Sequence, residues 1–146
     1  MEDDGLIEHR QAIDIHIGGL LLIKGFPCKV VERAVSKPGK HGGAKIHFVG
    51  IDIFTQRKYD TIYRTGDNVD VPIVTKQEYT IMNINDEEPP YLSLMSKENV
   101  EREDIQLPQN EMGEQIRDRF NDGDTIIVVV QKAMGQEMVI SYKIDK

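Results

Sequence analysis

The chain of 146 residues is 39% hydrophobic and 29% charged, a balance typical of a folded protein and not of a disordered one. Its apolar runs, such as Leu20–Ile23, are far too short to cross a bilayer, and the acidic start MEDDGLIEHR lacks the apolar core of a signal peptide. The single cysteine, Cys28, excludes an internal disulfide and suits a reducing compartment. We therefore expect a cytoplasmic protein with no membrane partner.

The net charge of −7, taken alone, argues against binding to a polyanion. The charge is unevenly distributed: residues 1–74 carry 10 Lys and Arg against 10 Asp and Glu, whereas residues 75–146 carry 8 against 15. Between Lys24 and Lys58 there are 8 basic and 2 acidic residues, a local charge of +6. This stretch either faces phosphates or is an ordinary solvated strand surface, and charge alone favours the second interpretation.

The first half of the chain has the pattern of a small β-barrel. Residues 1–14 are polar and aperiodic, which predicts a flexible N-terminal arm. From Ile15 to residue 73, short runs of β-forming residues alternate with Gly and Pro turns and show no helical period, which predicts a closed or nearly closed barrel. The predicted strands are Ile15–Lys24, Cys28–Val35, Ala44–Phe54, Lys58–Arg64 and Asn68–Val74.

The second domain is predicted at residues 74–146, because the charge balance changes between Val71 and Lys76. It contains one helical pattern, Asn110–Phe120, in which apolar residues recur four apart and Asn110 is placed to cap the first turn. Three strands, a helix and two strands are the order of an OB-fold, so the whole chain is predicted to be mainly β. The strands are Tyr79–Asn85, Tyr91–Met95, Glu103–Leu107, Thr125–Val130 and Met138–Ile144.

Searches for catalytic and metal-binding motifs give nothing, so we do not expect an enzyme. The chain has no phosphate-binding P-loop, no nucleophile elbow and no H-E-x-x-H zinc motif. Its four histidines are scattered, and no spacing supports a nucleophilic pair of Cys28 and His47. Cys28 is expected to be a small buried hydrophobic residue. An acidic cluster is expected to be a solvated face: Glu98, Glu101, Glu103 and Asp104.

One segment, Ser36–Lys45, is unusual because it contains three lysines, three glycines and a proline. Gly39 and Gly42 permit a tight reversal between two strands, which would bring Lys40 near the apex. Lys37 and Lys45 would then lie on the two arms, where they can attract an anion. From the residues alone, a phosphate-contacting loop and a flexible hairpin with solubilising lysines are equally good interpretations.

The stretch GFPCKVVERAVSKPGKHGGAKIHFVGIDIFTQRKYDTI, from Gly25 to Ile62, strongly resembles the eukaryotic translation initiation factor 5A family, the hypusine-containing relatives of bacterial elongation factor P. The resemblance continues through D-V-P at 70–72, Y-L-S-L at 91–94 and R-E-D-I-Q-L-P at 102–108, so it covers nearly the whole chain. It implies an SH3-like N-terminal barrel followed by a C-terminal OB-fold with one helix.

The resemblance also implies a modified residue. The lysine of G-K-H-G, here Lys40, would be converted to hypusine: deoxyhypusine synthase transfers an aminobutyl group from spermidine, and deoxyhypusine hydroxylase adds a hydroxyl group. No cofactor is implied. Lys37, Gly39, His41 and Gly42 would support the modified lysine, while Lys37 and Lys45 would contact RNA.

The implied partners are the ribosome, its rRNA and the peptidyl-tRNA. The modified lysine would promote peptide-bond formation at stalled steps such as consecutive prolines, and would assist termination. Two residues depart from the usual family pattern: Pro38 stands in place of threonine and Gly43 in place of a second histidine. Neither change touches Lys40, but both put the recognition of the loop by the modifying enzymes in question.

The main alternative is an RNA-binding OB-fold module involved in RNA transport or chaperoning. Such a module needs aromatic side chains in a basic groove, whereas the second half carries −7 and has no tryptophan. Its only aromatic residues are Tyr79, Tyr91, Phe120 and Tyr142. A small enzyme is the third interpretation, and it lacks any pairing of a nucleophile with a base.

Overall fold

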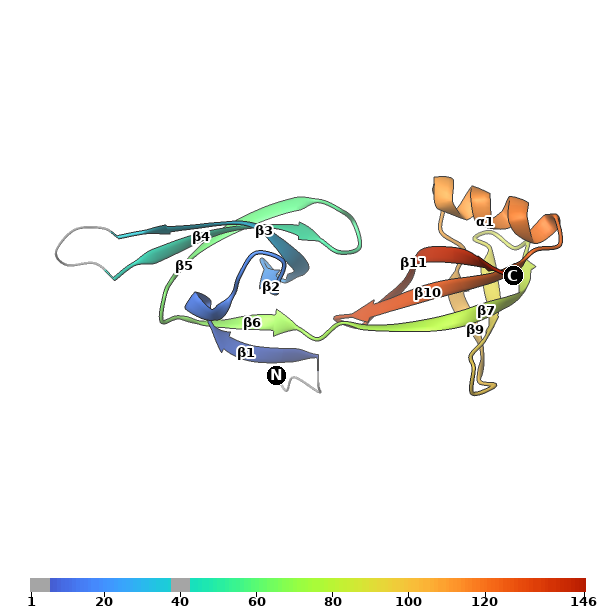
Figure 1. Cartoon of the computed structure of the whole chain (residues 1–146), viewed down its shortest axis with the longest axis horizontal. Helices are drawn as coiled ribbons and strands as arrows, with labels where there is room; N and C mark the ends of the chain where they lie inside the picture. The colour runs from blue at the N-terminus through green and yellow to red at the C-terminus, as the bar shows by residue number, and fades with distance from the viewer. Residues whose placement is uncertain (1–5, 38–42) are drawn as a thin grey trace. The chain divides into compact units, whose positions relative to one another are not determined.

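The computed structural model describes residues 6–37 and 43–146 and divides into two compact units, Met1–Ile73 and Val74–Lys146 (Figure 1). Each unit is built mainly of antiparallel strands around its own hydrophobic core. This confirms the prediction of a mainly β chain, with an SH3-like barrel first and an OB-fold second. Within the described residues, no helix is both long and apolar enough to span a membrane.

The first unit contains a four-stranded sheet in the order β2-β3-β4-β5 and a two-stranded sheet of β1 and β6. Ile46 and Phe48 of β4 are fully buried together with Leu21, Ile23 and Val30, and they form the centre of the barrel. A register shift between Val30 and Glu32 bends β3 over this core. The elements are β1 (Ile7–Gln11), the 3-10 helix η1 (Ala12–Asp14), β2 (Leu20–Ile23), β3 (Phe26–Ser36), β4 (Lys45–Asp52), β5 (Lys58–Arg64) and β6 (Asn68–Pro72).

The prediction of a flexible arm over residues 1–14 is wrong for the part that the structure describes. β1 pairs antiparallel with β6 from Ile7↔Pro72 to Gln11↔Asn68, and Ala12 is fully buried in the core. The polar sequence of β1 is explained by its place at a sheet edge, where most of its side chains face solvent. Residues 1–5 of the predicted arm lie outside the described residues.

The second unit is a five-stranded sheet in the order β11-β10-β7-β8-β9 with one helix. Along the chain, three strands precede the helix and two follow it, as predicted for an OB-fold. Its core is separate from that of the first unit and includes Ile81, Leu92, Leu94, Ile116 and Ile126. The elements are β7 (Thr75–Asn85), β8 (Tyr91–Met95), β9 (Glu101–Gln106), α1 (Glu111–Asn121), β10 (Thr125–Ala133) and β11 (Gln136–Asp145).

The helix α1 is positioned by its N-terminal cap and by its apolar face. The Asn110 side chain accepts a hydrogen bond of 3.1 Å from Gly113 N, which confirms the predicted cap. Gly113 cannot be replaced easily, because a Cβ there would collide with the backbone oxygen of Pro108. The apolar face also agrees with the prediction, since Ile116 is fully buried while Met112 and Phe120 pack against the core.

One arginine connects the two edge strands of this sheet. Arg102 of β9 donates hydrogen bonds of 2.7 and 2.8 Å to the two carboxylate oxygens of Glu137, which lies on β11. It also donates two bonds to Asp104, at 3.0 and 2.7 Å, and one of 3.3 Å to the Tyr79 hydroxyl. The guanidinium holds the pKa values of Glu137 and Asp104 below their usual range.

Candidate functional site

The candidate site lies at the end of the first unit where β3 leads into β4. Ser36 and Lys45 are the last partners in the register of these strands, so residues 37–44 connect them. Lys40 and its neighbours Pro38, Gly39, His41 and Gly42 lie outside the described residues. The structure therefore describes the strands that carry this connection and the two exits from it.

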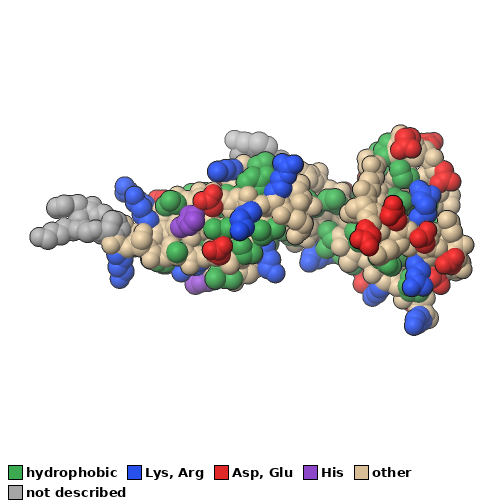
Figure 2. Space-filling view, turned by 90° about the horizontal axis from the view of Figure 1, so that it is seen from above, with side chains coloured by type: hydrophobic (Ala, Val, Ile, Leu, Met, Phe, Trp, Pro, Cys, Tyr) green, Lys and Arg blue, Asp and Glu red, His purple; other side chains and the backbone are tan. Residues whose placement is uncertain are grey.

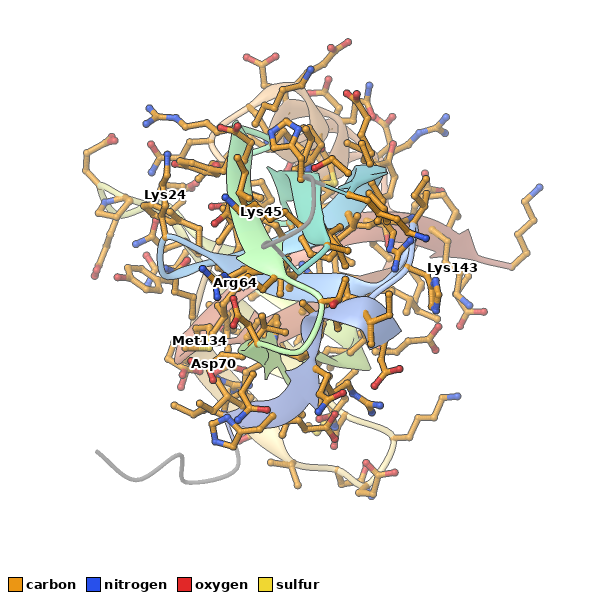
Figure 3. All side chains as sticks on the ribbon, turned by 90° about the vertical axis from the view of Figure 1, so that its left-hand side faces the viewer. Lys24, Lys45, Arg64, Asp70, Met134 and Lys143 are labelled. Atoms are coloured by element: carbon orange, nitrogen blue, oxygen red, sulfur yellow. The ribbon has the colours of Figure 1, made fainter. Side chains whose placement is uncertain are left out.

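Three basic residues around the connection, Lys37, Lys45 and Arg64, form what we call the basic collar. Lys37 is exposed directly after β3, Lys45 is the first residue of β4, and Arg64 is the last residue of β5. Lys45 is the register partner of both Ser36 and Arg64, so three strand ends meet at one place. Figure 3 labels Lys45 and Arg64 where they project from neighbouring strands.

Within residues 6–37 and 43–146, none of the three collar side chains makes an ion pair or a side-chain hydrogen bond. One basic residue of the +6 stretch, Arg33, has a different role. It donates bonds of 2.8 and 3.0 Å to the backbone oxygens of Ile15 and Ile13, so it tethers the segment that follows β1. Arg33 therefore has a structural role, whereas the three collar side chains remain available to a ligand.

The backbone that carries the collar is fixed by the turn after β5. Thr65 N donates to Ala44 O at 3.1 Å, which ties this turn to the residue before β4. The Asp67 carboxylate accepts a bond of 2.8 Å from Arg64 N, and Ile13 N donates to Thr65 O at 3.0 Å. Collar residues on β4 and β5 are therefore held by a ladder and by a hydrogen-bonded turn.

The remaining candidates from the sequence do not form a reactive site. Cys28 is fully buried, and burial together with Asp52 raises the pKa of its thiol to about 11. The Nε2 atom of His47 lies 2.8 Å from an Asp60 carboxylate oxygen, and this hydrogen bond lowers the pKa of Asp60. In the part of the chain that the structure describes, no group of three or more His, Cys, Asp or Glu residues is placed to hold a metal ion.

The aromatic residues of the second unit are mostly engaged within it, which weakens the interpretation as a single-strand-binding module. Tyr79 is buried beneath Arg102, whose Cζ lies 5.8 Å from the ring centroid. Phe120 packs on the core, and the Tyr142 hydroxyl donates to Gln115 at 3.0 Å. Acidic side chains are also spread over the face of this unit that Figure 2 presents. A basic groove lined by stacked aromatic side chains is not seen among the described residues.

Arg64 is the residue of the collar that the sequence alone does not single out. It lies far from Lys45 in the chain, and only the register of the β4–β5 hairpin makes the two residues neighbours. Counting outward from the turn between Asp52 and Lys58 would have paired them. At Gly43, one of the two unusual residues, an added Cβ would meet no atom of residues 6–37 or 43–146 within 4 Å.

Two family models match the chain: translation initiation factor 5A-like, N-terminal, over residues 8–67, and eukaryotic elongation factor 5A hypusine, DNA-binding OB fold, over residues 73–143. Eukaryotic translation initiation factor 5A-2 of Caenorhabditis elegans is 45% identical over 127 residues, 86% of this chain and 77% of the relative. The 5A-2 factor of Schizosaccharomyces pombe is 42% identical over 125 residues, 86% and 72% of the two chains.

Two solved structures have the same fold as this chain. The translation initiation factor eif-5a family protein of Naegleria fowleri superposes with a TM-score of 0.87 at 38% identity, covering 94% of this chain and 99% of that one. The eukaryotic translation initiation factor 5A of Methanococcus jannaschii gives a TM-score of 0.72 at 26% identity, covering 98% of each chain. The likeness therefore extends over both units.

Proposed function

Because this chain belongs to the eukaryotic translation initiation factor 5A family, we propose that it binds the ribosome beside the peptidyl-tRNA and promotes peptide-bond formation at stalled steps such as polyproline, and that it assists termination. The observation that carries the proposal is the match of both units to models of a translation factor family that is described by its hypusine. Lys40 in the G-K-H-G sequence is the residue proposed to carry this modification.

Lys40 would work by reach and charge. An unmodified lysine is one cation on a flexible stem of four carbons, whereas hypusine has a longer stem and two amines. Contacts of such a side chain with an RNA backbone carry little sequence information, which suits a factor that serves any tRNA. The protein itself then needs no catalytic group, since restricting the orientations of a substrate held by the ribosome can accelerate the reaction.

The neighbours of Lys40 are proposed to divide the remaining tasks. Gly39, His41 and Gly42 would give the loop a shape that deoxyhypusine synthase and deoxyhypusine hydroxylase can accept. Lys37 and Lys45 would contact rRNA or tRNA phosphates, which their exposed places at the two exits of the connection support. A factor with this role would act in the cytoplasm.

Peptide mapping by mass spectrometry tests the modification. In protein from cells that have both modifying enzymes, the peptide containing Lys40 should gain one aminobutyl group and one oxygen, and Lys37 and Lys45 should gain neither. Removing the hydroxylase should leave the aminobutyl group without the oxygen. If Lys40 remains unmodified in such cells, or if Lys37 or Lys45 is modified instead, the proposed role of Lys40 is wrong.

A further inference from the structure

Two cations of the collar, Lys45 and Arg64, face each other across β4 and β5, and neither has a counter-ion among the described residues. They are direct register partners in an antiparallel pair, where opposite Cβ atoms are about 5 Å apart and like charges repel. The nearest acid in this turn, Asp67, accepts from Arg64 N through one carboxylate oxygen and forms no ion pair with the Arg64 side chain. A fold that places two like charges opposite each other gains nothing in stability from the pair.

Both side chains lie on the outer face of the sheet. Along β5, Tyr63 packs against the core and makes a tilted ring contact with Phe48, so its neighbours Ile62 and Arg64 point the other way. Ile62 is 62% exposed, which confirms that this face is open to solvent. Lys45 is exposed as well and shares that face as the partner of Arg64.

The backbone that carries Lys45 and Arg64 is held in place by hydrogen bonds within the protein itself. Lys45 and Arg64 end neighbouring strands of one ladder, and Thr65 N bonds to Ala44 O directly beside them. A ligand that binds at this pair does not have to order the backbone, which avoids one of the main entropic costs of association.

From this arrangement we infer that Arg64 is a further anion-binding residue, which forms with Lys45 a two-cation clamp for the phosphate backbone of RNA. The inference rests on the proposed function for the identity of the ligand. It adds an RNA contact from β5 to the contacts proposed for the residues that flank the β3–β4 connection. A phosphate placed between the two side chains would remove their repulsion. The guanidinium fork of arginine can hold two phosphate oxygens at once, and the ammonium of Lys45 supplies a point charge beside it.

The test compares Arg64→Gln with Arg57→Gln in the full-length, modified protein. Arg57 is exposed, belongs to the same unit and precedes the opposite end of β5, so the control makes the same charge change away from the collar. Binding to purified eukaryotic ribosomes is measured between 50 and 200 mM salt. One lost phosphate contact should weaken binding at low salt and reduce the affinity ratio of wild type to variant about threefold over this range.

Three results would overturn the inference. The first is that Arg64→Gln binds as tightly as wild type at every salt concentration. The second is a loss of affinity that is equal at all salt concentrations, which indicates that the substitution removed no ionic contact. The third is an equal loss for Arg57→Gln, which indicates a diffuse charge effect. Loss of folding is checked by thermal unfolding, where Arg64→Gln should melt at the same temperature as wild type or above it, because a repulsion is removed.

Two more variants separate this inference from the proposed function. Arg64→Lys keeps the charge and should recover part of the lost affinity, but not all, because the bidentate geometry is missing. Lys45→Gln tests the RNA contact proposed for Lys45 while Arg64 stays in place. If Lys45→Gln weakens ribosome binding and Arg64→Gln does not, the clamp is wrong while the proposed function stands. If neither variant changes ribosome binding, the RNA contact proposed for Lys45 fails as well.

Discussion

Cys28 illustrates how the fold decides the chemistry of a residue. Its thiol is fully buried in β3, and its pKa is raised to about 11 by burial and by the charge of Asp52. Only the thiolate reacts readily with alkylating agents. We therefore expect that iodoacetamide at pH 8 labels Cys28 in the denatured chain but leaves the folded chain essentially unlabelled over the same time. Labelling at equal rates in both states would show that this part of the core is open.

The same raised pKa predicts how stability depends on pH in alkaline solution. The ordinary pKa of the thiol is 9.0, and the folded state keeps the proton to about pH 11. The unfolded chain loses this proton first, so the contribution of Cys28 to stability is complete below pH 9 and declines between 9 and 11. In thermal unfolding across this range, the stability of wild type should fall more steeply with pH than that of Cys28→Val. Identical pH profiles of stability for the two proteins would contradict the raised pKa of the Cys28 thiol.

The functional residues differ in how far the sequence alone could identify them. Lys37 and Lys45 flank the glycine-rich segment in the chain, so local spacing is enough to place them near it. Arg64 becomes their neighbour only through the β4–β5 register, which depends on the turn geometry and on which face of β5 is buried. For Arg33 the sequence is misleading, because its charge suggests ligand binding whereas its side chain donates hydrogen bonds to the backbone at Ile13 and Ile15.

At the scale of elements, the arginine that joins β9 to β11 gives a stability prediction. The side chains of Arg102 and Glu137 are 20% and 24% exposed and are joined by two short hydrogen bonds. Arg102→Met keeps the apolar stem but removes these bonds, and should lower the free energy of unfolding of the second unit by about 2 kcal/mol. Arg119→Met is the control, because Arg119 makes a longer contact of 3.6 Å from an exposed side chain. Equal effects of the two substitutions in chemical denaturation would contradict a special role for Arg102.

The hydrogen bonds of Arg102 to Asp104 and Glu137 also predict how stability changes at acidic pH. Arg102 lowers the pKa values of Asp104 and Glu137 from their ordinary values of 3.8 and 4.5. Carboxylates with lowered pKa values stabilise the folded state above their unfolded values, and this stabilisation is lost as the pH falls through the lowered ones. The difference in stability between wild type and Arg102→Met should therefore narrow as the pH falls below about 4. A constant difference between pH 7 and pH 3 would show that the carboxylates do not contribute.

The helix α1 gives a third prediction at this scale. Asn110→Ala removes the acceptor for Gly113 N and should lower the free energy of unfolding by about 1 kcal/mol. The neighbouring exposed residue Gln109 makes no capping bond, so Gln109→Ala serves as the control and should be nearly neutral. If both substitutions have the same effect in urea denaturation, the cap contributes nothing.

Elements were predictable from the sequence where the pattern is local. The helix is marked by Met112, Ile116 and Phe120 and by a capping residue, and the OB-fold strands by β-forming runs between turns. β1 was missed because its residues are polar and its only structural signal is pairing with β6, which is distant in the chain. The same holds for the Arg102–Glu137 connection, which joins two strands that look unremarkable by themselves.

At the scale of the whole molecule, the two units contain separate cores, and we expect each to fold alone. Fragments 1–73 and 74–146 should each show a cooperative thermal transition and native-like circular dichroism, although their small size leaves each only marginally stable. The domain boundary proposed from the sequence depends on this result. A fragment that folds only when the other is added would show that the chain is a single cooperative unit.

The central claim, that Lys40 is the working residue of a translation factor, is tested most directly by translation of a polyproline message in a reconstituted system. Lys40→Arg keeps a positive charge but offers no primary amine for the aminobutyl transfer, and it has a shorter reach than hypusine. Hypusinated wild-type protein should relieve stalling, whereas Lys40→Arg and unmodified wild type should not, and Lys37→Arg should retain most of the activity. If Lys40→Arg relieved stalling as well as the hypusinated protein, the role of Lys40 would be contradicted.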